Sequence, residues 1–458
     1  MVKVSVIITA HNYGRYLREC LNSVLRQTFD DYEIVVVDDG STDETPQILE
    51  EYVKKYPEKI KVVRLNGLGL PTACNHGIKA SCGEYIIRLD ADDFFDENIL
   101  LIESTILDKN PDIDLVYPDY YEVDADGNIK HYKRLMRVND EVKLLHRSPL
   151  AAGAMFRRRC YDEIGGYNES LKYQEDYDFW LRFTSRFKVY NVNLPLLYYR
   201  RHGANMSKNF KGRMEARRVV KEEFVKKHLK EKLENLKVLG LIPARRESRL
   251  NGESIALTEV AGKPLIAYTI EEALKSKNLD RVVVSTEDEE IARVARRYGA
   301  EVLMRPEELA RRGVPVENVV KYTLEKLERE GYEPDIVVLL HVVSPLKKRH
   351  HIDEAVNTML IFDMDSVISV TPDIKFHWKP GMYGLVPLFE KRLLKDDRET
   401  LYLENGAIYA SKSDVWKSGR AVGNKVGHIL MSEDESIHID SEYDLWLVEQ
   451  LIKSGRHG

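Results

Sequence analysis

Two groups of carboxylates early in the chain could do chemistry together. Asp38 and Asp39 end the apolar run YEIVVVDDG, and Asp90, Asp92 and Asp93 end the apolar run EYIIRLDADD. Open α/β sheets bind their ligands beyond the carboxyl ends of the strands. Acids that meet there repel one another unless a hard divalent cation neutralises them, and such a cation also bridges phosphates. One cluster alone could be a turn or a helix cap, but two at successive strand ends favour a site for a metal and a phosphorylated ligand.

A separate acid lies late in the first half, in the segment QEDYDFW. A hydroxyl that displaces a phosphorylated leaving group needs one carboxylate to accept its proton. The reaction also needs a cation to stabilise the departing phosphate. Asp176 suits the first task, although it could instead satisfy free N–H groups at the start of a helix. The sequence therefore offers early acids for a metal and a late acid for a base.

The elements that must position these residues alternate between strands and helices. The runs VSVIITA, YEIVVVDDG, KIKVVRL and EYIIRLDADD predict strands, and the spacing of apolar residues predicts a helix over GRYLRECLNSVLRQT. Continuous apolar runs are typical of parallel strands that are buried on both faces. We therefore expect an α/β domain with a mostly parallel sheet over residues 1–210.

A charged segment and a second alternating half follow. Residues 211–236 are rich in helix formers and charge, which predicts a helical linker; its basic face could touch anionic lipid, but a solvated helix is the interpretation we prefer. The strand runs KVLGLIPA, RVVVST, AEVLMR, DIVVLLHV and SVISVT then restart the alternation. We expect a second α/β domain over residues 237–458. The halves share no sequence repeat, so any kinship between them is one of fold.

Composition and charge limit the classes of function. A chain of 458 residues is longer than one core usually serves. The net charge of −6 gives no electrostatic case for nucleic acid as a partner. The four cysteines form no CxxC pair, which argues against a disulfide framework or a zinc site. No apolar run reaches the roughly 18 residues of a membrane helix, and the N-terminal run is too short for a signal peptide. We expect a cytoplasmic protein.

The first half resembles the family 2 glycosyltransferases, which have the GT-A fold. The resemblance is carried, in order, by VSVIITAHNYGRYLRECLNSVLRQTFDDYEIVVVDDGSTDET, RLDADDFFDENIL, GAMFRRRCYDEIGGYNESL, QEDYDFWLRF and YYRRHGANMS. It implies transfer of a sugar, with inversion, from a nucleotide-diphosphate donor to a glycan or lipid-linked acceptor. The QxxRW signature of processive synthases is absent, so a single transfer per encounter is implied.

The same resemblance implies roles for particular residues. Asp176 matches the general base, and Asp92 matches the direct ligand of Mg²⁺ or Mn²⁺. The residues implied to meet the nucleotide sugar are Asp38, Asp39, Asp90, Asn75 and His202. Asp39 would contact the donor base, and His202 the diphosphate. Cys74-Asn75 stands where the family usually has Arg-Asn, which changes the expected donor contacts.

The second half resembles the acylneuraminate cytidylyltransferases, which activate nonulosonic acids as CMP-sugars. Its segments include LIPARRESRL, VAGKPLIAYTIEEAL, DIVVLLHVVSPLKKRHHIDEAV, NGAIYASKSD and HIDSEYDLWLVEQLI. Taken alone, the first loop could be a plain βα turn with solvated arginines. The resemblance implies a second GT-A-like or Rossmann-like domain, CTP and a nonulosonic acid as ligands, and a homo-oligomer. The implied nucleotide-binding residues are Arg245, Ser248, Arg249, Lys263, Ser344 and Asn405, with a metal at Asp440.

Several departures from that family's pattern surround the predicted nucleotide site. Glu253 lies close to the position of a lysine, Arg311-Arg312 replaces Asp-Thr, Leu403-Glu404 replaces an arginine, His341 to Lys347 replaces QPTSPLR, and His438-Ile439-Asp440 replaces the late acidic pair. His can bind a metal, although Mg²⁺ prefers oxygen ligands. Two hypotheses remain open. The chain is either a bifunctional enzyme of surface polysaccharide or glycoconjugate biosynthesis, or an active glycosyltransferase with a non-catalytic nucleotide-binding or docking domain. The set Asp92, Asp176 and His202 disfavours a purely structural protein.

Overall fold

The structure is a computed structural model that describes residues 2–143, 145, 152–202, 210–247, 249–250, 253–392, 398 and 401–455. Its contacts divide the chain into two compact units, Met1–Val220 and Lys221–Gly458. Each unit contains a sheet with helices on it, so the predicted α/β class with mostly parallel strands is confirmed. The division lies within the segment 211–236, for which we expected a helical linker.

The first unit is built on one long sheet. Its elements are β1 (Val4–Ala10), α1 (Gly14–Leu25), β2 (Tyr32–Asp39), α2 (Thr45–Lys55), β3 (Ile60–Leu65), α3 (Leu70–Ala80), β4 (Tyr85–Asp90), β5 (Phe94–Phe95), α4 (Ile99–Lys109), β6 (Leu115–Val123), β7 (Ile129–Lys133), β8 (Met155–Arg157), α5 (Arg158–Ile164), α6 (Glu175–Thr184), β9 (Val189–Arg200) and the first part of α7 (Phe210–His228). The strand order is β3-β2-β1-β4-β8-β6-β9-β5, with β7 on β6. β3, β2, β1 and β4 run parallel.

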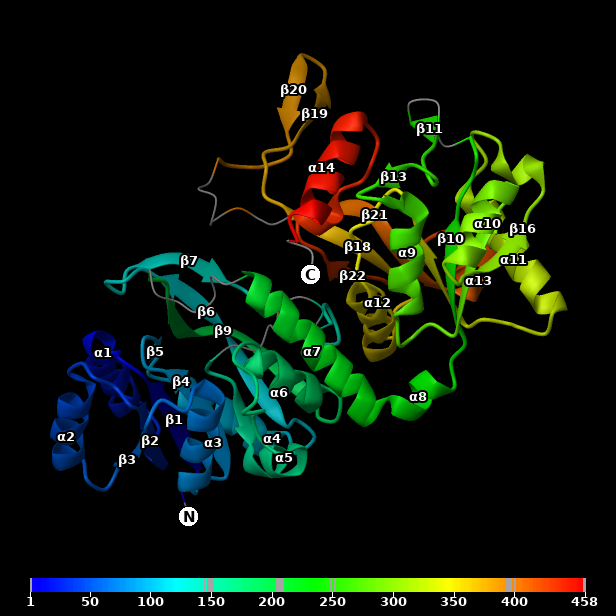
Figure 1. Ribbon diagram of the computed structural model, residues 1–458. Coiled ribbons are helices and arrows are strands. Elements are labelled where there is room, and N and C mark those ends of the chain that lie inside the picture. Colours follow the sequence, from blue (N-terminus) through cyan, green and yellow to red (C-terminus); the bar gives the residue numbers. More distant parts are fainter. Residues whose placement is uncertain are drawn as a thin grey trace. The chain divides into compact units, whose positions relative to one another are not determined.

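Alternation along the buried strands explains how helices cover both faces. Ile8 packs in one core with Leu17 of α1. Its neighbour Ile7 faces α3, where a Cβ at Gly77 would lie 2.6 Å from Ile7 and 2.9 Å from Val37. Figure 1 shows α1 and α2 on one side of the blue strands and α3 on the other. Gly77 therefore permits the close approach of α3 to the sheet.

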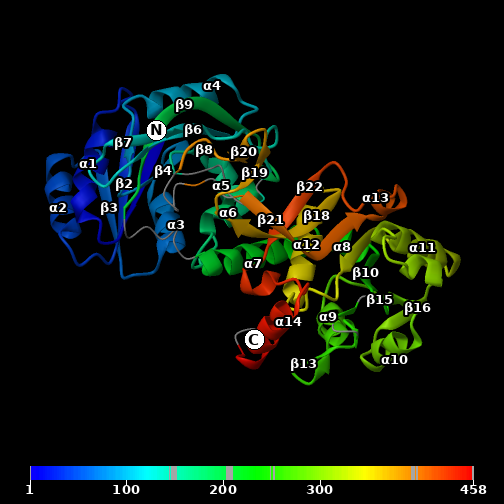
Figure 2. The same ribbon diagram turned by 90° about the horizontal axis from the view of Figure 1, so that it is seen from above.

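The second unit repeats the arrangement. Its elements after α7 are α8 (Lys230–Glu234), β10 (Val238–Pro243), β11 (Arg249–Leu250), β12 (Glu253–Ser254), β13 (Glu259–Val260), β14 (Lys263–Pro264), α9 (Leu265–Leu274), β15 (Arg281–Thr286), α10 (Glu289–Arg297), β16 (Glu301–Met304), η2 (Glu307–Ala310), α11 (Val316–Arg329), β17 (Ile336–Leu340), α12 (Arg349–Phe362), β18 (Ser366–Asp373), β19 (Trp378–Gly381), β20 (Gly384–Pro387), β21 (Leu401–Lys412), α13 (Ser413–Lys417), β22 (Val426–Leu430), η4 (Asp434–Ser436) and α14 (Glu442–Lys453). The main sheet has the order β16-β15-β10-β17-β21-β18-β22. α12 runs alongside β18 and β22 (Figure 2).

The strand order creates one switch point in each sheet. β1 lies between β2 and β4, and β10 lies between β15 and β17. In each unit the later strands are therefore added first on one side of the first strand and then on its other side. A crevice opens beyond the carboxyl ends of the strands where the order reverses, and open α/β sheets bind their ligands there. The acidic run that begins at Asp90 and the loop that begins at Ala244 both follow such strand ends.

One exposed feature bears on possible partners. The hairpin β19–β20 presents apolar side chains to solvent, including Met382, Tyr383 and Leu385. Self-association through the second unit stays a prediction, and so does contact of the basic face of α7 with lipid. Among the described residues, no helix is both long enough and apolar enough to cross a membrane.

Helix α7 carries side chains for both cores. Arg217 donates two hydrogen bonds to Gln174 Oε1, at 2.9 and 2.6 Å, and stacks on the ring of Tyr177. Lys221 is 2% exposed and its Nζ donates to Glu354 Oε1 at 2.9 Å and to Thr358 Oγ1 at 3.1 Å. Lys221 and Glu354 are therefore a buried ion pair of the second unit.

We predict that Lys221→Met destabilises the second unit by about 3–5 kcal/mol, because it leaves the Glu354 charge buried without its ammonium partner. The double variant Lys221→Met/Glu354→Leu should recover most of that loss. The free energy of opening is measured by hydrogen exchange of the α12 amides in the full chain. Lys226→Met is the matched control, because its exposed pair with Glu222 contributes less than about 1 kcal/mol. A single variant as stable as the double variant would contradict the prediction.

Candidate functional site

A buried acidic cluster follows β4 in the first unit. Asp92 and Asp93 are almost fully buried, directly after the strand that Asp90 ends. Burial, together with the charge of Asp90, raises the pKa of Asp92 above its ordinary value. Burial and the charge of Asp92 raise the pKa of Asp93 still more strongly. Because burial disfavours the ionised form of these carboxylates, a nearby cation would stabilise that ionised form.

His202 meets this cluster although it lies far along the chain. Its Nε2 is 2.9 Å from Asp92 Oδ2, and its ring packs against Tyr13 and Tyr16 at centroid distances of 6.0 and 5.3 Å. Neighbouring ligands of an octahedral ion with bonds near 2.1 Å lie about 3.0 Å apart. The two atoms therefore fit one divalent cation. The next acid, Asp93, has a buried Oδ2 without a hydrogen-bond partner among the described residues.

Arg88 is a member of the site that the sequence analysis missed. Its Nε and Nη2 donate to the two carboxylate oxygens of Asp90 at 3.0 and 3.1 Å. Asp90 is therefore held by a bidentate ion pair, which leaves Asp92 as the better placed metal ligand. A charged residue inside the apolar strand IIRLD, two positions before Asp90 and hence on the same face, was a signal that could have found it.

The predicted base lies in the first turn of α6. Asp176 Oδ1 accepts the backbone N–H of Tyr177 at 2.7 Å, which is a local contact at the helix start. Its neighbour Glu175 is almost fully buried, and burial together with the charge of Asp176 raises the pKa of Glu175 to about 7. Arg88 partly opposes this rise. The carboxylates at the start of α6 therefore lie within electrostatic range of the ion pair on β4.

Three residues predicted to bind the donor hold loops in place. The carboxylate of Asp39 accepts the backbone N–H groups of Leu68 and Gly69, both at 2.7 Å, and Asp38 Oδ1 accepts that of Ser41 at 2.9 Å. Asn75 binds the segment 161–169 through the Tyr161 hydroxyl, both backbone groups of Tyr167 and the Glu169 carboxylate. Direct contact of Asp38, Asp39 or Asn75 with a donor stays a prediction.

The second unit has a cavity at its own switch point. The cavity has a volume of about 380 Å³ and lies beyond the carboxyl ends of β10 and β17. Its polar lining consists of Arg245, Arg305, His341 and His438, and the remaining wall is mostly aliphatic. Two guanidinium groups beside two imidazoles suit an anionic ligand with an apolar portion. The predicted Arg245 therefore lies in a cavity of suitable character.

The segment His438-Ile439-Asp440 closes one side of that cavity. His438 Nδ1 lies 3.1 Å from Ser344 Oγ, and the backbone N–H of Ile439 donates to Val343 O at 2.8 Å. Asp440 is 83% exposed, 3.6 Å from His438 Nε2. The structure thus brings the predicted Ser344 next to His438, which stands where the resembled family has an acid. A metal at Asp440 stays a prediction.

Buried basic residues lie in the lining of the cavity or next to it. The Nζ of Lys347 donates to His341 O, Ser344 O and Thr269 Oγ1, and burial lowers its pKa to about 7. Burial also lowers the pKa of His341 to about 4, so this ring is neutral at pH 7. Arg305 donates to Glu287 and to Ala244 O, both at 2.9 Å. Arg305 was not among the predicted site residues, although an arginine at the end of the predicted strand AEVLMR was a usable signal.

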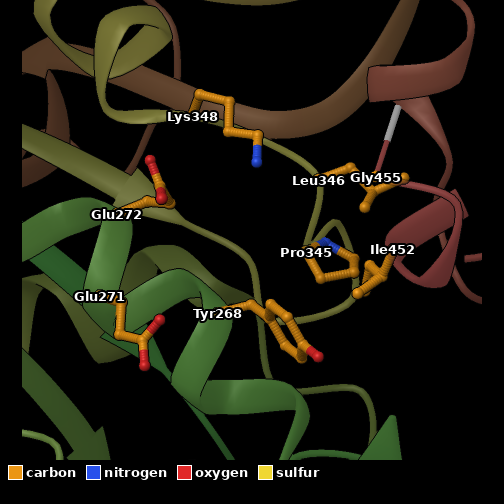
Figure 3. Close-up of a pocket in the computed structure, with 8 residues that line it drawn as sticks. All are labelled: Tyr268, Glu271, Glu272, Pro345, Leu346, Lys348, Ile452 and Gly455. Carbon is orange, nitrogen blue, oxygen red and sulfur yellow. The ribbon is translucent and has the colours of Figure 1, made fainter. Parts of the chain in front are cut away.

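The remaining predicted residues lie away from the cavity lining or outside the description. Lys263 Nζ pairs with Glu271 at 2.7 Å, and Glu271 borders a second cavity of about 240 Å³ between α9, the loop at Pro345 and α14. Figure 3 shows Tyr268, Glu271 and Glu272 on α9, with Pro345, Leu346 and Ile452 opposite. Asn405 is buried and binds Ser369 and Ser436. Ser248 lies outside the described residues, as do the side chains of Arg249 and Glu253.

One histidine cluster lies close enough together to hold a metal, among the residues that the structure describes. His350 Nε2 and His351 Nε2 are 3.2 Å apart, and Glu435 is 3.6 Å from His351. However, His351 Nδ1 accepts the backbone N–H of Lys348 at 3.1 Å, which places the proton of the neutral ring on Nε2. The cluster therefore fits a hydrogen-bonded helix cap better than a metal site.

The chain matches two family models, one for each unit. The model described as Glycosyl transferase family 2 matches residues 5–165, and the model described as Cytidylyltransferase matches residues 239–451. Both matches confirm the resemblances found in the sequence.

Individual relatives divide in the same way. An uncharacterized glycosyltransferase of Rickettsia typhi is 31% identical over 239 residues, which is 50% of this chain and 74% of the relative. The chondroitin synthase of Escherichia coli is 30% identical over 205 residues, 44% of this chain but only 30% of the synthase. The CMP-N,N'-diacetyllegionaminic acid synthase of Legionella pneumophila is 34% identical over 228 residues, 48% of this chain and 97% of that enzyme.

Among solved structures, S. aureus TarS 1-349 in complex with UDP-GlcNAc is 27% identical with a TM-score of 0.42, and the match covers 49% of this chain and 67% of that TarS fragment. The family assignment depends instead on the two family models and on the relatives that are covered over most of their length. The chain therefore belongs to glycosyltransferase family 2 through its first half and to the cytidylyltransferase family through its second half.

Proposed function

We propose that the first unit is an inverting glycosyltransferase that moves a sugar from a nucleotide-diphosphate donor to a glycan or lipid-linked acceptor. The observation that carries this proposal is the meeting of Asp92 and His202 at the end of β4, 2.9 Å apart. Asp92 and His202 would hold Mg²⁺ or Mn²⁺. Bound there, the cation would neutralise the charge that develops on the leaving diphosphate.

The remaining chemistry falls to the protein's own side chains. The acceptor hydroxyl oxygen forms the new bond to the anomeric carbon, and the bond from that carbon to the diphosphate oxygen breaks with its electron pair leaving on the diphosphate. The hydroxyl proton passes to the carboxylate of Asp176. Arg88 holds Asp90 in a bidentate ion pair. Asp90 therefore stays in place beside Asp92 and is left out of the proton transfer.

For the second unit we propose binding of CTP in the 380 Å³ cavity and slow cytidylyl transfer to a nonulosonic acid. The support is the basic lining with Arg245 and Arg305, together with the similarity to the CMP-N,N'-diacetyllegionaminic acid synthase of Legionella pneumophila. The full chain would then serve surface polysaccharide or glycoconjugate synthesis with two transferase activities. The second candidate is a nucleotide-binding domain without turnover, which is favoured by His438 in place of an acid and by Glu253 in place of a lysine.

Asp92→Ala should remove most of the metal-dependent binding of a nucleoside diphosphate, because it deletes one of the two ligands proposed for the cation. Binding of UDP and GDP to the full chain is measured by calorimetry with Mn²⁺ and with EDTA. Asp112→Ala, which removes an exposed carboxylate paired with Lys188, is the control and should bind like the unaltered protein. Equal affinity in EDTA and Mn²⁺ would show that the first unit does not depend on a metal.

Asp176→Asn should reduce sugar transfer by about 10²–10⁴-fold, because the amide cannot accept the acceptor's proton. Nucleoside diphosphate binding should stay within about twofold of the unaltered value, because Asp176 lies apart from the pair Asp92 and His202 in this scheme. Single-turnover transfer from a panel of nucleotide sugars is the assay, with Asp162→Asn on the exposed side of α5 as the control. A variant that keeps half the original rate would show that Asp176 only caps the helix.

We expect slow pyrophosphate release from CTP, Mg²⁺ and a panel of nonulosonic acids, and a rise of at least roughly tenfold in Glu253→Lys. A unit charge at about 4 Å contributes roughly 4 kcal/mol at an effective dielectric of 20, and about 1.4 kcal/mol already corresponds to a tenfold rate. Arg245→Ala should lose CTP binding in the same full-length protein. Rapid release by the unaltered chain would overturn the expectation of impaired turnover. Absence of both release and CTP binding would contradict the nucleotide role altogether.

A further inference from the structure

Arg200, the last residue of β9, is buried to an extent that is rare for an arginine. It is 1% exposed, and charged side chains are seldom fully buried unless they are paired. Its Nε donates to the backbone oxygen of Asp92 at 2.8 Å, and its Nη1 donates to Ala125 O at 2.9 Å. Its Nη2 pairs with the carboxylate of Glu19 on α1. The guanidinium therefore joins the acidic turn to two other parts of the first unit.

The backbone of Arg200 holds the same turn from a second direction. Its N–H donates to Asp93 Oδ1 at 2.8 Å, while its side chain holds the carbonyl of Asp92. β5 pairs with β9 in the antiparallel register Phe94 opposite Tyr198, and this register continued past β5 brings Arg200 to the level of Asp92, next to Asp93. One residue thus fixes both the main chain of Asp92 and the side chain of Asp93.

Arg200 also supports His202 through an aromatic ring. The guanidinium carbon lies 4.8 Å from the centroid of the Tyr16 ring, and the His202 ring lies 5.3 Å from the same ring. The same guanidinium carbon lies 5.3 Å from the centroid of the Phe94 ring. Movement of Arg200 would therefore disturb Asp92 through a hydrogen bond and His202 through the Tyr16 ring.

We propose that Arg200 is a positioning residue that sets the spacing of Asp92 and His202 so that both reach one divalent cation. This inference rests on the proposed metal-dependent transfer by the first unit. Arg200 touches neither donor nor metal in this scheme and acts through the two ligands. Its neighbour Arg201 is 57% exposed and pairs with Glu122 instead, so the two adjacent arginines of YYRRH have different roles.

Arg200→Lys is the informative substitution. Lysine keeps the positive charge but lacks the planar fork of an arginine, so it cannot donate to Asp92 O, Ala125 O and Glu19 at once. A role that needs only a buried charge would survive this change, and a positioning role would not. Arg201→Lys makes the same chemical change on the exposed neighbour and is the matched control.

The first measurement is binding of Mn²⁺ alone to the full chain, followed by electron paramagnetic resonance. Asp92→Ala identifies the part of the binding that belongs to this site. We expect at least roughly tenfold weaker Mn²⁺ binding at the Asp92-dependent site in Arg200→Lys and a change below twofold in Arg201→Lys. Unchanged Mn²⁺ affinity in Arg200→Lys would overturn the proposal. If no binding to the unaltered chain depends on Asp92, the metal in the proposed function is wrong, and the second measurement decides the positioning role.

The second measurement does not need a metal. The imidazole carbon signal of His202, assigned by its loss in His202→Gln, reports the surroundings of that ring in the metal-free chain. It should move in Arg200→Lys and stay in place in Arg201→Lys. If Arg200→Lys does not fold, Glu19→Gln is measured in its place. This variant weakens only the ion pair at Arg200 Nη2, so the His202 signal should move by a smaller amount. A His202 signal that stays in place in the folded test variant would overturn the positioning role.

Discussion

Repulsion among Asp90, Asp92 and Asp93 is the constraint on which the first unit depends. The three carboxylates lie within four residues at the end of β4, and burial strengthens every interaction between their charges. Each acid has its own partner: Arg88 for Asp90, His202 for Asp92 and the backbone N–H of Arg200 for Asp93. Two of these partners come from the end of β9. By placing β9 beside β5, the long sheet therefore brings partners to these acids in addition to forming the hydrophobic core.

The second unit uses the same strand order with the opposite charge. Its cavity presents Arg245 and Arg305, and the neutral His341 adds a polar surface without a further charge. An acidic site must recruit a cation before a diphosphate can approach, whereas a basic site can attract a triphosphate directly. Glu287 moderates the basic character, because it pairs with Arg305. Under the proposed function, one fold would receive a phosphorylated ligand in two different ways.

The sequence was sufficient to predict β1 to β4, β10 and β15 to β18, and the acids that follow β2 and β4, because buried parallel strands leave continuous apolar runs and polar residues follow them. It did not predict β6, β8, β9, β21 or β22. It could not place His202 beside Asp92, since that contact depends on the path of β9 across the sheet. It also did not show that Asp39 and Asn75 bind loop backbone or neighbouring side chains. Turns leave N–H groups without a partner, and a nearby carboxylate or amide accepts them whatever else it binds. Arg88 and Arg305 were visible as charges next to or inside apolar runs but were not recognised as partners of acids.

Helix α7 limits how freely the two units can be recombined with those of other proteins. Arg217 reaches Gln174 in the first unit, and Lys221, about one helical turn later, reaches Glu354 in the second. A gene fusion cut between them would leave each anchor with its own unit, but it would divide a continuous helix. A chimera that exchanges one half must therefore keep the anchor of the retained unit and supply a helical segment that continues α7. The joint between the two enzyme families is part of both folded units and is not a spacer that can be replaced by an arbitrary linker.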